Sequence, residues 1–193
     1  MTKIIGVTGG IGSGKSKVMN YLNDLGYTIY LSDEAGKRIM QNPVIINKVQ
    51  DIFDENVIEN GLLNRKKIGE IVFNNPEKLK QLNQIIHPAV AEDFKTFIAN
   101  NKDKDFIFYE SAILIESNRM DDFDAVVLIT APEEVRIQRV MNRDGISREK
   151  VIERMQNQMS DEEKRKFANF EIPNENFEKT KAYVSNMLHF LKK

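Results

Sequence analysis

Apolar residues in the first part of the chain change from one spacing to another. Lys3 to Thr8 is a short apolar and β-branched run, which predicts a strand. From Lys17 to Leu25 the apolar residues recur at helical spacing. Tyr27 to Leu31 is again rich in residues typical of strands. This β-α-β order predicts a parallel sheet with a right-handed crossover.

Residues 43 to 100 show no convincing strand alternation. Pro43 opens one helical stretch, Asn60-Gly61 predicts a turn, and three further helices are predicted at Arg65–Phe73, Pro76–Ile86 and Pro88 to about Ala99. An ordinary crossover needs only about a dozen residues. The connection between the second and third strands is far longer than that, which predicts an inserted helical lobe over about 43–103. We expect this lobe to hold a second substrate.

Three more strands are predicted in the last half of the chain, at Phe106–Tyr109, Ala125–Thr130 and Phe170–Ile172. Helices are expected from Pro132 onward and from Glu175 to Leu191. The pattern therefore predicts an α/β core over about 1–42 and 104–193, with a parallel sheet of about five strands.

A glycine-rich segment, Gly-x-x-x-x-Gly-Lys-Ser, joins the first strand to the first helix. Its glycines lack Cβ, so the backbone N–H groups can approach an anion at the N-terminus of a helix. Lys15 can reach the β- and γ-phosphates, and the Ser16 hydroxyl can ligate Mg²⁺. The three fixed elements co-occur by chance on the order of 1% of the time or less in a chain of this length. We expect nucleoside-triphosphate binding by Gly9, Gly10, Ile11, Gly12, Ser13, Gly14, Lys15 and Ser16.

Carboxylates follow the second and third strands. Asp33 comes directly after the second strand, at the edge where ligands of open parallel sheets bind. It suits a general base for a hydroxyl that attacks the γ-phosphate, but it also suits a helix cap. Glu110 follows an apolar run, as does the metal-side acid of many nucleotide-binding proteins. Glu116 fits either a site residue or a surface residue.

Arg136, Arg139 and Arg143 share one face of the helix that starts near Pro132. Arginines at this place can clamp phosphates. Acidic residues nearly balance them, so a solvated, salt-bridged face is an equal alternative.

Composition narrows the class of protein. The chain of 193 residues has a formal net charge of −1, which gives no bulk attraction to nucleic acid or to an anionic membrane. It has no cysteine, and its two histidines are too far apart to suggest a metal cluster. No segment approaches the roughly 18 apolar residues of a membrane span, and we expect no signal peptide, because the residues before the first strand lack its pattern. We expect a cytoplasmic enzyme that acts on a small molecule, as a monomer or weak homo-oligomer.

Besides the glycine-rich segment, which is a P-loop, a further set of short motifs is spread along the chain: Ser32-Asp33, Gly61-Leu-Leu-Asn-Arg65, Ile71-Val-Phe73, His87-Pro88, Ile113-Leu-Ile-Glu116, Gln138-Arg139, Arg143-Asp144, Gln158, Ala168 and Asn174. Through these residues the whole chain resembles the dephospho-CoA kinase family. The family pattern usually has Thr at position 17, Pro at 112 and Asp at 169, where this chain has Lys17, Ala112 and Asn169.

The resemblance implies a three-layer α/β/α P-loop kinase with an inserted acceptor lobe and a helical lid over about 136–165. It implies transfer of the ATP γ-phosphate to the ribose 3′-hydroxyl of dephospho-CoA, the last step of coenzyme A synthesis, with Mg²⁺. Asp33 would be the general base, and Arg65, His87 and Glu116 would contact the acceptor. Lys15, Lys17 and the loop would bind ATP together with Arg139 and Arg143, and Lys15 and Arg143 would act in the transfer.

Two alternatives remain. Another small-molecule kinase would share the loop and lid and differ in its acceptor lobe. A GTPase switch would need Asn-Lys-x-Asp, and Asn101-Lys-Asp-Lys104 fails at its fourth position. Asp33-Glu-Ala-Gly36 matches Asp-x-x-Gly but follows Lys15 too soon to leave room for a first switch loop.

Overall fold

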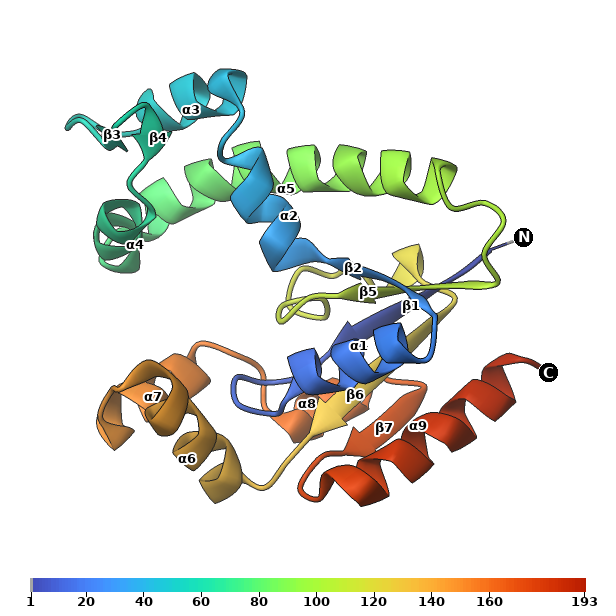
Figure 1. Cartoon of the computed structure of the whole chain (residues 1–193). Helices are drawn as coiled ribbons and strands as arrows, with labels where there is room; N and C mark the ends of the chain where they lie inside the picture. Colours follow the sequence, from blue (N-terminus) through green and yellow to red (C-terminus); the bar gives the residue numbers. More distant parts are fainter. Residues whose placement is uncertain (1) are drawn as a thin grey trace. The chain divides into compact units, whose positions relative to one another are not determined.

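A five-stranded sheet forms the centre of the larger of two compact units (Figure 1). The computed structural model describes residues 2–193. One unit contains the chain up to Tyr30 and from Lys102 to Lys193, and the other is Leu31–Asn101. The strands are β1 (Lys3–Thr8), β2 (Thr28–Leu31), β5 (Phe106–Glu110), β6 (Ala125–Thr130) and β7 (Phe170–Pro173), in the spatial order β2-β5-β1-β6-β7. The predicted α/β fold with about five strands is confirmed.

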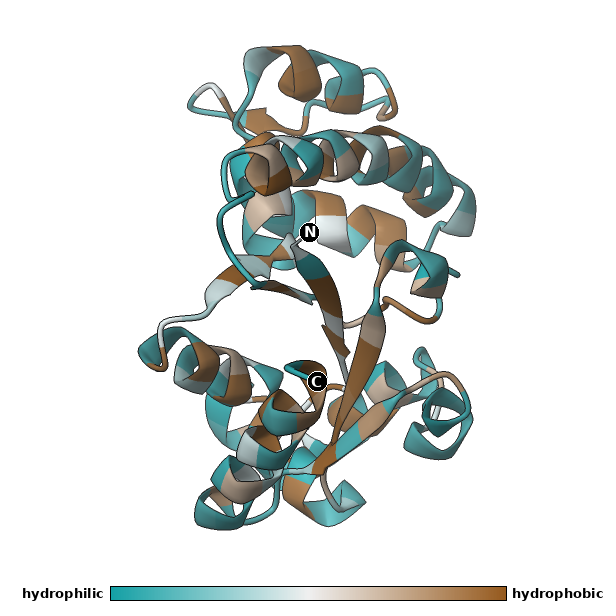
Figure 2. Cartoon of the chain, turned by 90° about the vertical axis from the view of Figure 1, so that its right-hand side faces the viewer, coloured by the Kyte–Doolittle hydropathy of each residue, from teal (hydrophilic) through white to brown (hydrophobic). Residues whose placement is uncertain are grey.

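The central strands are apolar because both faces of the sheet are covered. Every residue of β5 and β6 is buried, and Figure 2 shows hydrophobic colour along strands of the central sheet. β1 pairs in parallel with both, for example Val7 with Glu110 and Val7 with Val127. The carboxyl ends of β1, β5 and β6 therefore meet at one edge of the sheet.

Five helices surround this sheet within the first unit: α1 (Lys15–Asp24), α6 (Glu133–Asp144), α7 (Arg148–Gln156), α8 (Asp161–Arg165) and α9 (Phe177–Leu191). A short 3₁₀ helix spans Met120–Asp122. α1 packs on β5, α8 on β6 and α9 on β7. α6 and α7 pack on each other through Ile137, Val140 and Val151. The spacing of apolar residues did not predict α7 and α8 as separate helices. Most of their residues are polar, and each helix buries only one side chain.

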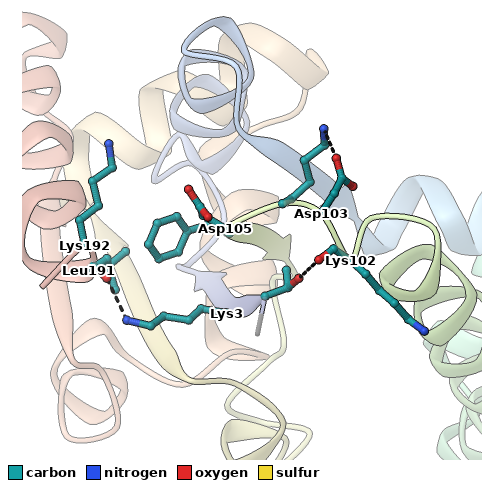
Figure 3. A pocket seen from close by; sticks show the side chains of 9 residues that line it. Lys3, Lys102, Asp103, Asp105, Leu191 and Lys192 are labelled. Carbon is teal, nitrogen blue, oxygen red and sulfur yellow. Dashed lines mark hydrogen bonds and ion pairs between the residues drawn. The ribbon is translucent and has the colours of Figure 1, made fainter.

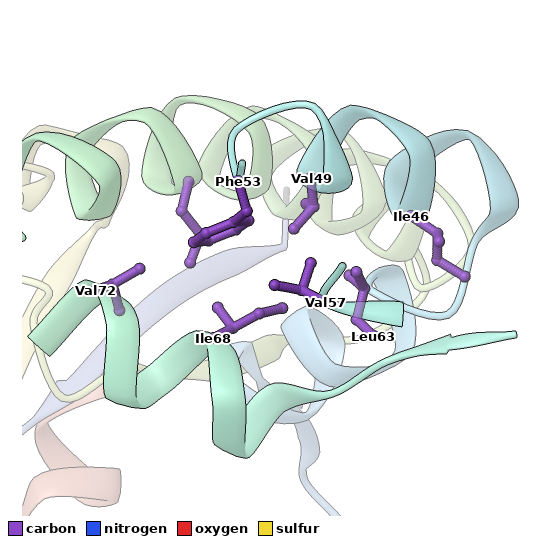
Figure 4. Packing of buried hydrophobic residues seen from close by; sticks show 8 residues of the cluster. Ile46, Val49, Phe53, Val57, Leu63, Ile68 and Val72 are labelled. Carbon is purple, nitrogen blue, oxygen red and sulfur yellow. The ribbon is translucent and has the colours of Figure 1, made fainter. Parts of the chain in front are cut away.

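The second unit has a hydrophobic core of its own (Figure 4). It contains α2 (Ser32–Ile39), α3 (Pro43–Gln50), the hairpin β3 (Ile58–Glu59) and β4 (Leu62–Leu63), α4 (Arg65–Phe73) and α5 (Pro76–Ala99). The long helix α5 packs against α2, α3 and α4. The unit begins at Leu31, before α2, whereas the sequence pattern began the insertion at about residue 43.

The predicted turn at Asn60-Gly61 is confirmed, and it closes a hairpin that the pattern did not predict. Both residues have positive φ, 52° and 78°, as in the tight turns that suit the twist of two strands. The strands β3 and β4 have two residues each, which is too short for an alternating pattern to be recognised.

The prediction of two helices separated at Pro88 is wrong, because α5 is continuous from Pro76 to Ala99. An interior proline lacks a hydrogen-bond donor and typically costs about 3 kcal/mol or more. Buried side chains on both sides of the proline, Leu82 before it and Val90 and Phe94 after it, hold the helix together. Tertiary packing thus overrides the local preference.

Within residues 2–193, no helix is both long enough and apolar enough to cross a membrane.

Two glycine-to-alanine substitutions should change stability in opposite directions. A Cβ on Gly6 would lie 2.7 Å from Leu114 Cδ1 and 3.1 Å from Phe123 Cγ, so Gly6→Ala should lower the free energy of unfolding by about 1–3 kcal/mol. Gly69 lies in α4 with nothing within 4 Å of its Cβ position, so Gly69→Ala should raise stability by about 0.5–1 kcal/mol. Urea unfolding of both variants measures this. Shifts of the same sign would contradict the packing described at Gly6.

Candidate active site

The glycine loop leaves the end of β1 at Gly9 and enters α1 at Lys15. Gly12 and Gly14 have φ angles of 79° and 87°, in the left-handed region that favours glycine. Neighbours behind the loop exclude side chains as well. A Cβ on Gly12 would meet the Arg136 carbonyl oxygen, and one on Gly14 would meet the side-chain amide of Asn174. The glycines are therefore required by internal packing in addition to any ligand.

Lys15 bridges the loop. Its ammonium donates a hydrogen bond to the Gly9 carbonyl oxygen at 2.8 Å and lies 3.9 Å from Glu110 Oε1. Glu110 ends β5, the strand beside β1, so the sheet register brings its carboxylate to the loop. Both side chains are about one-tenth exposed. The candidate site therefore contains a cation held close to, but not tightly against, a carboxylate.

Ser16 and Lys17 occupy the first turn of α1, and both are exposed. The Lys17 ammonium lies 4.0 Å from the centre of the Phe177 ring, at the start of α9. The residue that departs from the family pattern thus joins α1 to α9 through a cation–π contact.

Side chains from the C-terminal half hold the back of the loop, and we call them the loop brace: Arg136, Arg139, Gln158 and Asn174. Arg136 Nε donates to the Ile11 carbonyl at 3.0 Å, and Gln158 Oε1 accepts from the Ile11 N–H at 2.8 Å. Asn174 Nδ2 donates to the Ser13 carbonyl at 2.8 Å.

The loop brace sets the direction of the loop peptides. In a trans peptide the carbonyl and the following N–H point in opposite directions. With the Ile11 and Ser13 carbonyls held at the back, the N–H groups of Gly12 and Gly14 point to the other side. That is the arrangement of an anion-binding nest at a helix N-terminus. The N–H groups of Ile11 and Ser13 are used internally, by Gln158 and by the Gly10 carbonyl.

The three arginines of α6 have different surroundings. Arg136 is buried and also pairs with Asp161 at 3.2 Å. Arg139 donates to the Asn174 carbonyl at 2.8 Å and approaches the Gly12 and Ser13 carbonyls at 3.4 Å.

Arg143 is apart from this group. Its guanidinium is exposed and pairs with Asp144 at 2.7 Å, and Asp144 also pairs with Arg154 at 3.0 Å. The Arg143 hydrogen bond, followed by the charges of Arg143 and Arg154, holds the pKa of Asp144 below its ordinary value. The structure brings Arg139 to the loop and leaves Arg143 in a surface ion-pair group.

Glu116 is held by a lysine that no sequence motif indicated. Lys164, which is fully buried, places its ammonium 2.8 Å from Glu116 Oε1 and donates to the Ala112 carbonyl at 3.3 Å. Glu116 Oε1 also accepts from the Met159 N–H at 3.2 Å. This carboxylate fastens the segment after β5 to the start of α8.

Asn169 keeps a polar role despite its departure from the family pattern. Its Oδ1 accepts from the Val126 N–H at 2.8 Å, and its own N–H donates to the Val126 carbonyl at 2.8 Å. The side chain thus fixes the start of β7 on β6.

Three of the predicted site residues belong to the second unit. Asp33 is the second residue of α2, directly after β2, and it is exposed. The interpretation of Asp33 as a helix cap is wrong, because Leu31 occupies the cap position and no side chain caps α2. Arg65 begins α4, and His87 lies on α5 beside Pro88; both are exposed.

A cavity of about 380 Å³ lies at the other end of the sheet, beside the first residues of β1 and β5 (Figure 3). Its charges are used within the protein. Lys3 Nζ donates to the Leu191 carbonyl at 3.0 Å, and Lys104 pairs with Asp103 at 2.9 Å. The Lys102 and Lys192 side chains extend in different directions. The cavity therefore offers no converging set of charges comparable to the glycine loop.

Comparisons with known proteins agree with this geometry. The family profile described as dephospho-CoA kinase matches residues 3–179. The chain is 40% identical over 186 residues to a dephospho-CoA kinase of Dehalococcoides mccartyi, covering 94% of each chain. It is 39% identical over 188 residues to one of Bacteroides fragilis, covering 97% of this chain and 92% of the other.

Solved structures support the same assignment. A crystal structure from Thermus thermophilus matches with a TM-score of 0.89 and 34% identity over 98% of both chains. A dephospho-CoA kinase from Campylobacter jejuni matches with a TM-score of 0.71 and 30% identity, over 100% of this chain and 98% of that one. Shikimate kinase from Bacteroides thetaiotaomicron, at 13% identity and a TM-score of 0.56, shares the fold alone. The family profile and the relatives together show that the chain belongs to the dephospho-CoA kinase family.

Proposed function

We propose that this chain transfers the γ-phosphate of ATP to the ribose 3′-hydroxyl of dephospho-CoA, giving CoA and ADP as the last step of coenzyme A synthesis. The observation that carries the proposal is family membership over nearly the whole chain, with the glycine loop built as an anion nest. Because the reaction draws on ATP, we place the activity in the cytoplasm.

In this proposal the loop holds the ATP phosphates. The N–H groups of Gly12 and Gly14 and the N-terminus of α1 supply fixed positive potential. Lys15 exchanges its contact with the Gly9 carbonyl for a phosphate oxygen, which places its charge where negative charge builds up during transfer.

The loop also fits a magnesium ion bound mainly through the nucleotide. Among residues 2–193, no group of three His, Cys, Asp or Glu side chains is placed to hold a metal. Magnesium at phosphate sites uses one or two protein oxygens and several waters. The exposed Ser16 hydroxyl and the Glu110 carboxylate would be those oxygens. The ion supplies further neutralisation of phosphate charge.

Asp33 is our candidate for the general base. The 3′-oxygen forms a bond to the γ-phosphorus while the bond from that phosphorus to the β–γ bridging oxygen breaks, and ADP leaves. The hydroxyl proton goes to the Asp33 carboxylate. Asp33 is exposed and is not used as a helix cap, so its oxygens are open to a substrate.

The remaining roles in the proposal fall to residues expected in the acceptor lobe and the lid. Arg65, His87 and Glu116 would contact dephospho-CoA, and Arg139 would act on the nucleotide through the loop. Arg143 would reach ATP by leaving Asp144, an exposed ion pair of the kind whose net stabilisation is only about 0–1 kcal/mol. Lys17 would contribute to ATP binding through the position of α1.

An acceptor panel tests the activity. ADP release in the presence of ATP should require dephospho-CoA, and nucleosides or shikimate should not replace it. Lys15→Ala should lower the rate by at least about 10²-fold, as expected for loss of a charge that acts in the transition state. Lys179→Ala, which removes an exposed lysine of α9, is the matched control and should be nearly as active as the parent. Turnover of shikimate instead of dephospho-CoA would overturn the proposal.

Asp33→Asn should reduce kcat for dephospho-CoA by about 10²–10⁴-fold, because it removes the proton acceptor at nearly constant size. Its thermal midpoint and its affinity for ATP should stay close to those of the parent. Glu77→Gln is the matched control, since Glu77 is an exposed acid in the first turn of α5. An Asp33→Asn enzyme with normal kcat would remove Asp33 from the reaction.

Asn174→Asp should weaken ATP binding through the loop. The substitution replaces the donor to the Ser13 carbonyl with a second acceptor, so the carbonyl loses its partner and faces negative charge. We expect the KM for ATP to rise by about tenfold, with little change in the KM for the acceptor. Asn176→Asp is the control, because Asn176 caps α9 and Asp caps a helix equally well. Equal KM values for ATP in the two variants would contradict the loop brace.

A further inference from the structure

Thr180 is a fully buried residue near the start of α9, in contact with the loop brace. Its hydroxyl oxygen lies 3.0 Å from the Pro173 carbonyl oxygen, 3.0 Å from that of Asn176 and 3.2 Å from Asn174 Oδ1. A hydroxyl has one proton, so it can donate to only one of these three acceptors at a time. The acceptor that receives this proton decides what Thr180 contributes.

Asn174 Oδ1 is the acceptor that most needs the proton. Pro173 and Asn176 are exposed residues, and the Asn176 carbonyl already accepts from the Thr180 backbone N–H at 3.0 Å. Asn174 is only 1% exposed. Of the residues that the structure describes, Thr180 is the only one that donates to Asn174 Oδ1. Loss of this donor would leave a buried acceptor without a partner, in a place where water does not replace it, and that is costly.

The Asn174 amide is held at both ends. Its Nδ2 donates to the Ser13 carbonyl at 2.8 Å, and its Oδ1 accepts from Thr180. The last torsion of an asparagine has broad minima, so one contact alone leaves the amide room to turn. A turned amide would bring Oδ1 toward the Ser13 carbonyl, and two acceptors cannot bond to each other. The Thr180 hydroxyl therefore helps to keep the donor end of Asn174 on the glycine loop.

This contact joins the C-terminal helix to the anion nest. With the Ser13 carbonyl held by Asn174, the Gly14 N–H points to the opposite side of the loop, where a phosphate would bind. α9 also contacts α1, because the Lys17 ammonium lies 4.0 Å from the centre of the Phe177 ring. α9 therefore supports both the loop and the helix that follows the loop.

We propose that Thr180 is a positioning residue for the nucleotide, and that its hydroxyl acts by orienting the Asn174 amide toward the Ser13 carbonyl. The inference rests on the proposed function, because it requires that the loop bind the phosphates of ATP. It makes the C-terminal helix a determinant of the affinity for ATP without any contact between Thr180 and the ligand.

Two pairs of substitutions separate the hydroxyl from the rest of the side chain. Thr180→Val replaces the hydroxyl with a methyl group at nearly constant shape, whereas Thr180→Ser keeps the hydroxyl. In calorimetry with ATP and no acceptor, Thr180→Val should bind about three- to tenfold more weakly than the parent, the worth of one hydrogen bond. Thr180→Ser should bind as the parent does. Thr180→Ala differs from Thr180→Ser only in the hydroxyl and should also bind more weakly. The KM for dephospho-CoA should stay the same in all three.

A matched control and a double-mutant cycle exclude a merely structural effect. Thr96 of α5 donates its hydroxyl to the carbonyl of Glu92, four residues before it, as Thr180 does to Asn176. Thr96→Val should therefore bind ATP as the parent does. In an Asn174→Ala background, Thr180→Val should cause no further loss of affinity, because the amide that it positions is absent. General loosening of α9 would instead give losses that add.

The failure of this inference differs from the failure of the proposed function. If the parent binds ATP and phosphorylates dephospho-CoA, but Thr180→Val and Thr180→Ala bind ATP as Thr96→Val does, Thr180 has no positioning role and the proposed function stands. Additive losses in the cycle would overturn the inference in the same way. If the parent does not bind ATP, the proposed function fails and the inference fails with it.

Discussion

The geometry of the glycine loop depends on hydrogen bonds to its backbone carbonyls from side chains far along the chain. Arg136 is 125 residues from Ile11, and Asn174 is 161 residues from Ser13. The sheet makes these contacts possible, because β6 lies beside β1 and β7 beside β6, so that α6 and the start of α9 return to the loop. Asn174 is itself held by the Thr180 hydroxyl, 3.2 Å from its Oδ1. The shape of the loop therefore rests on a layer of polar contacts behind it as well as on the glycines.

Two acids, one at the end of β5 and one six residues after it, illustrate how different partners give similar residues different roles. Glu110 ends β5 and lies 3.9 Å from Lys15 of the loop, whereas Glu116 is tied to the buried Lys164 at 2.8 Å. A buried ion pair adds little net stability, but it is strongly destabilising to break. The Lys164 pair therefore acts mainly to fix where the irregular segment after β5 lies. The Lys15 ammonium is instead held at the glycine loop, by the Gly9 carbonyl at 2.8 Å and beside Glu110.

The spacing of apolar residues correctly predicted those helices and strands whose bounds depend on their own sequence. β1, β6 and α4 have the predicted bounds, because their apolar spacing and turn residues agree with the final structure. The glycine loop was recognisable because its residue types carry its chemistry.

Long-range packing determined the rest. α5 passes through Pro88 because side chains on both sides are buried, which the local sequence does not reveal. The same holds for Arg136 and Lys164, which look like ordinary surface cations in the sequence yet are buried with polar partners. For Asp33, the sequence correctly predicted a position directly after β2. Its role as a general base remains a proposal.

The loop brace also has a consequence for synthesis on the ribosome. The loop is translated first, yet Gln158 and Asn174 emerge only after most of the chain has been made. Contacts between residues so distant in sequence cannot form until both partners are available. A nascent chain therefore carries the whole glycine loop long before the side chains that hold it have been made. The loop brace, and any site that depends on it, can be completed only near the end of synthesis.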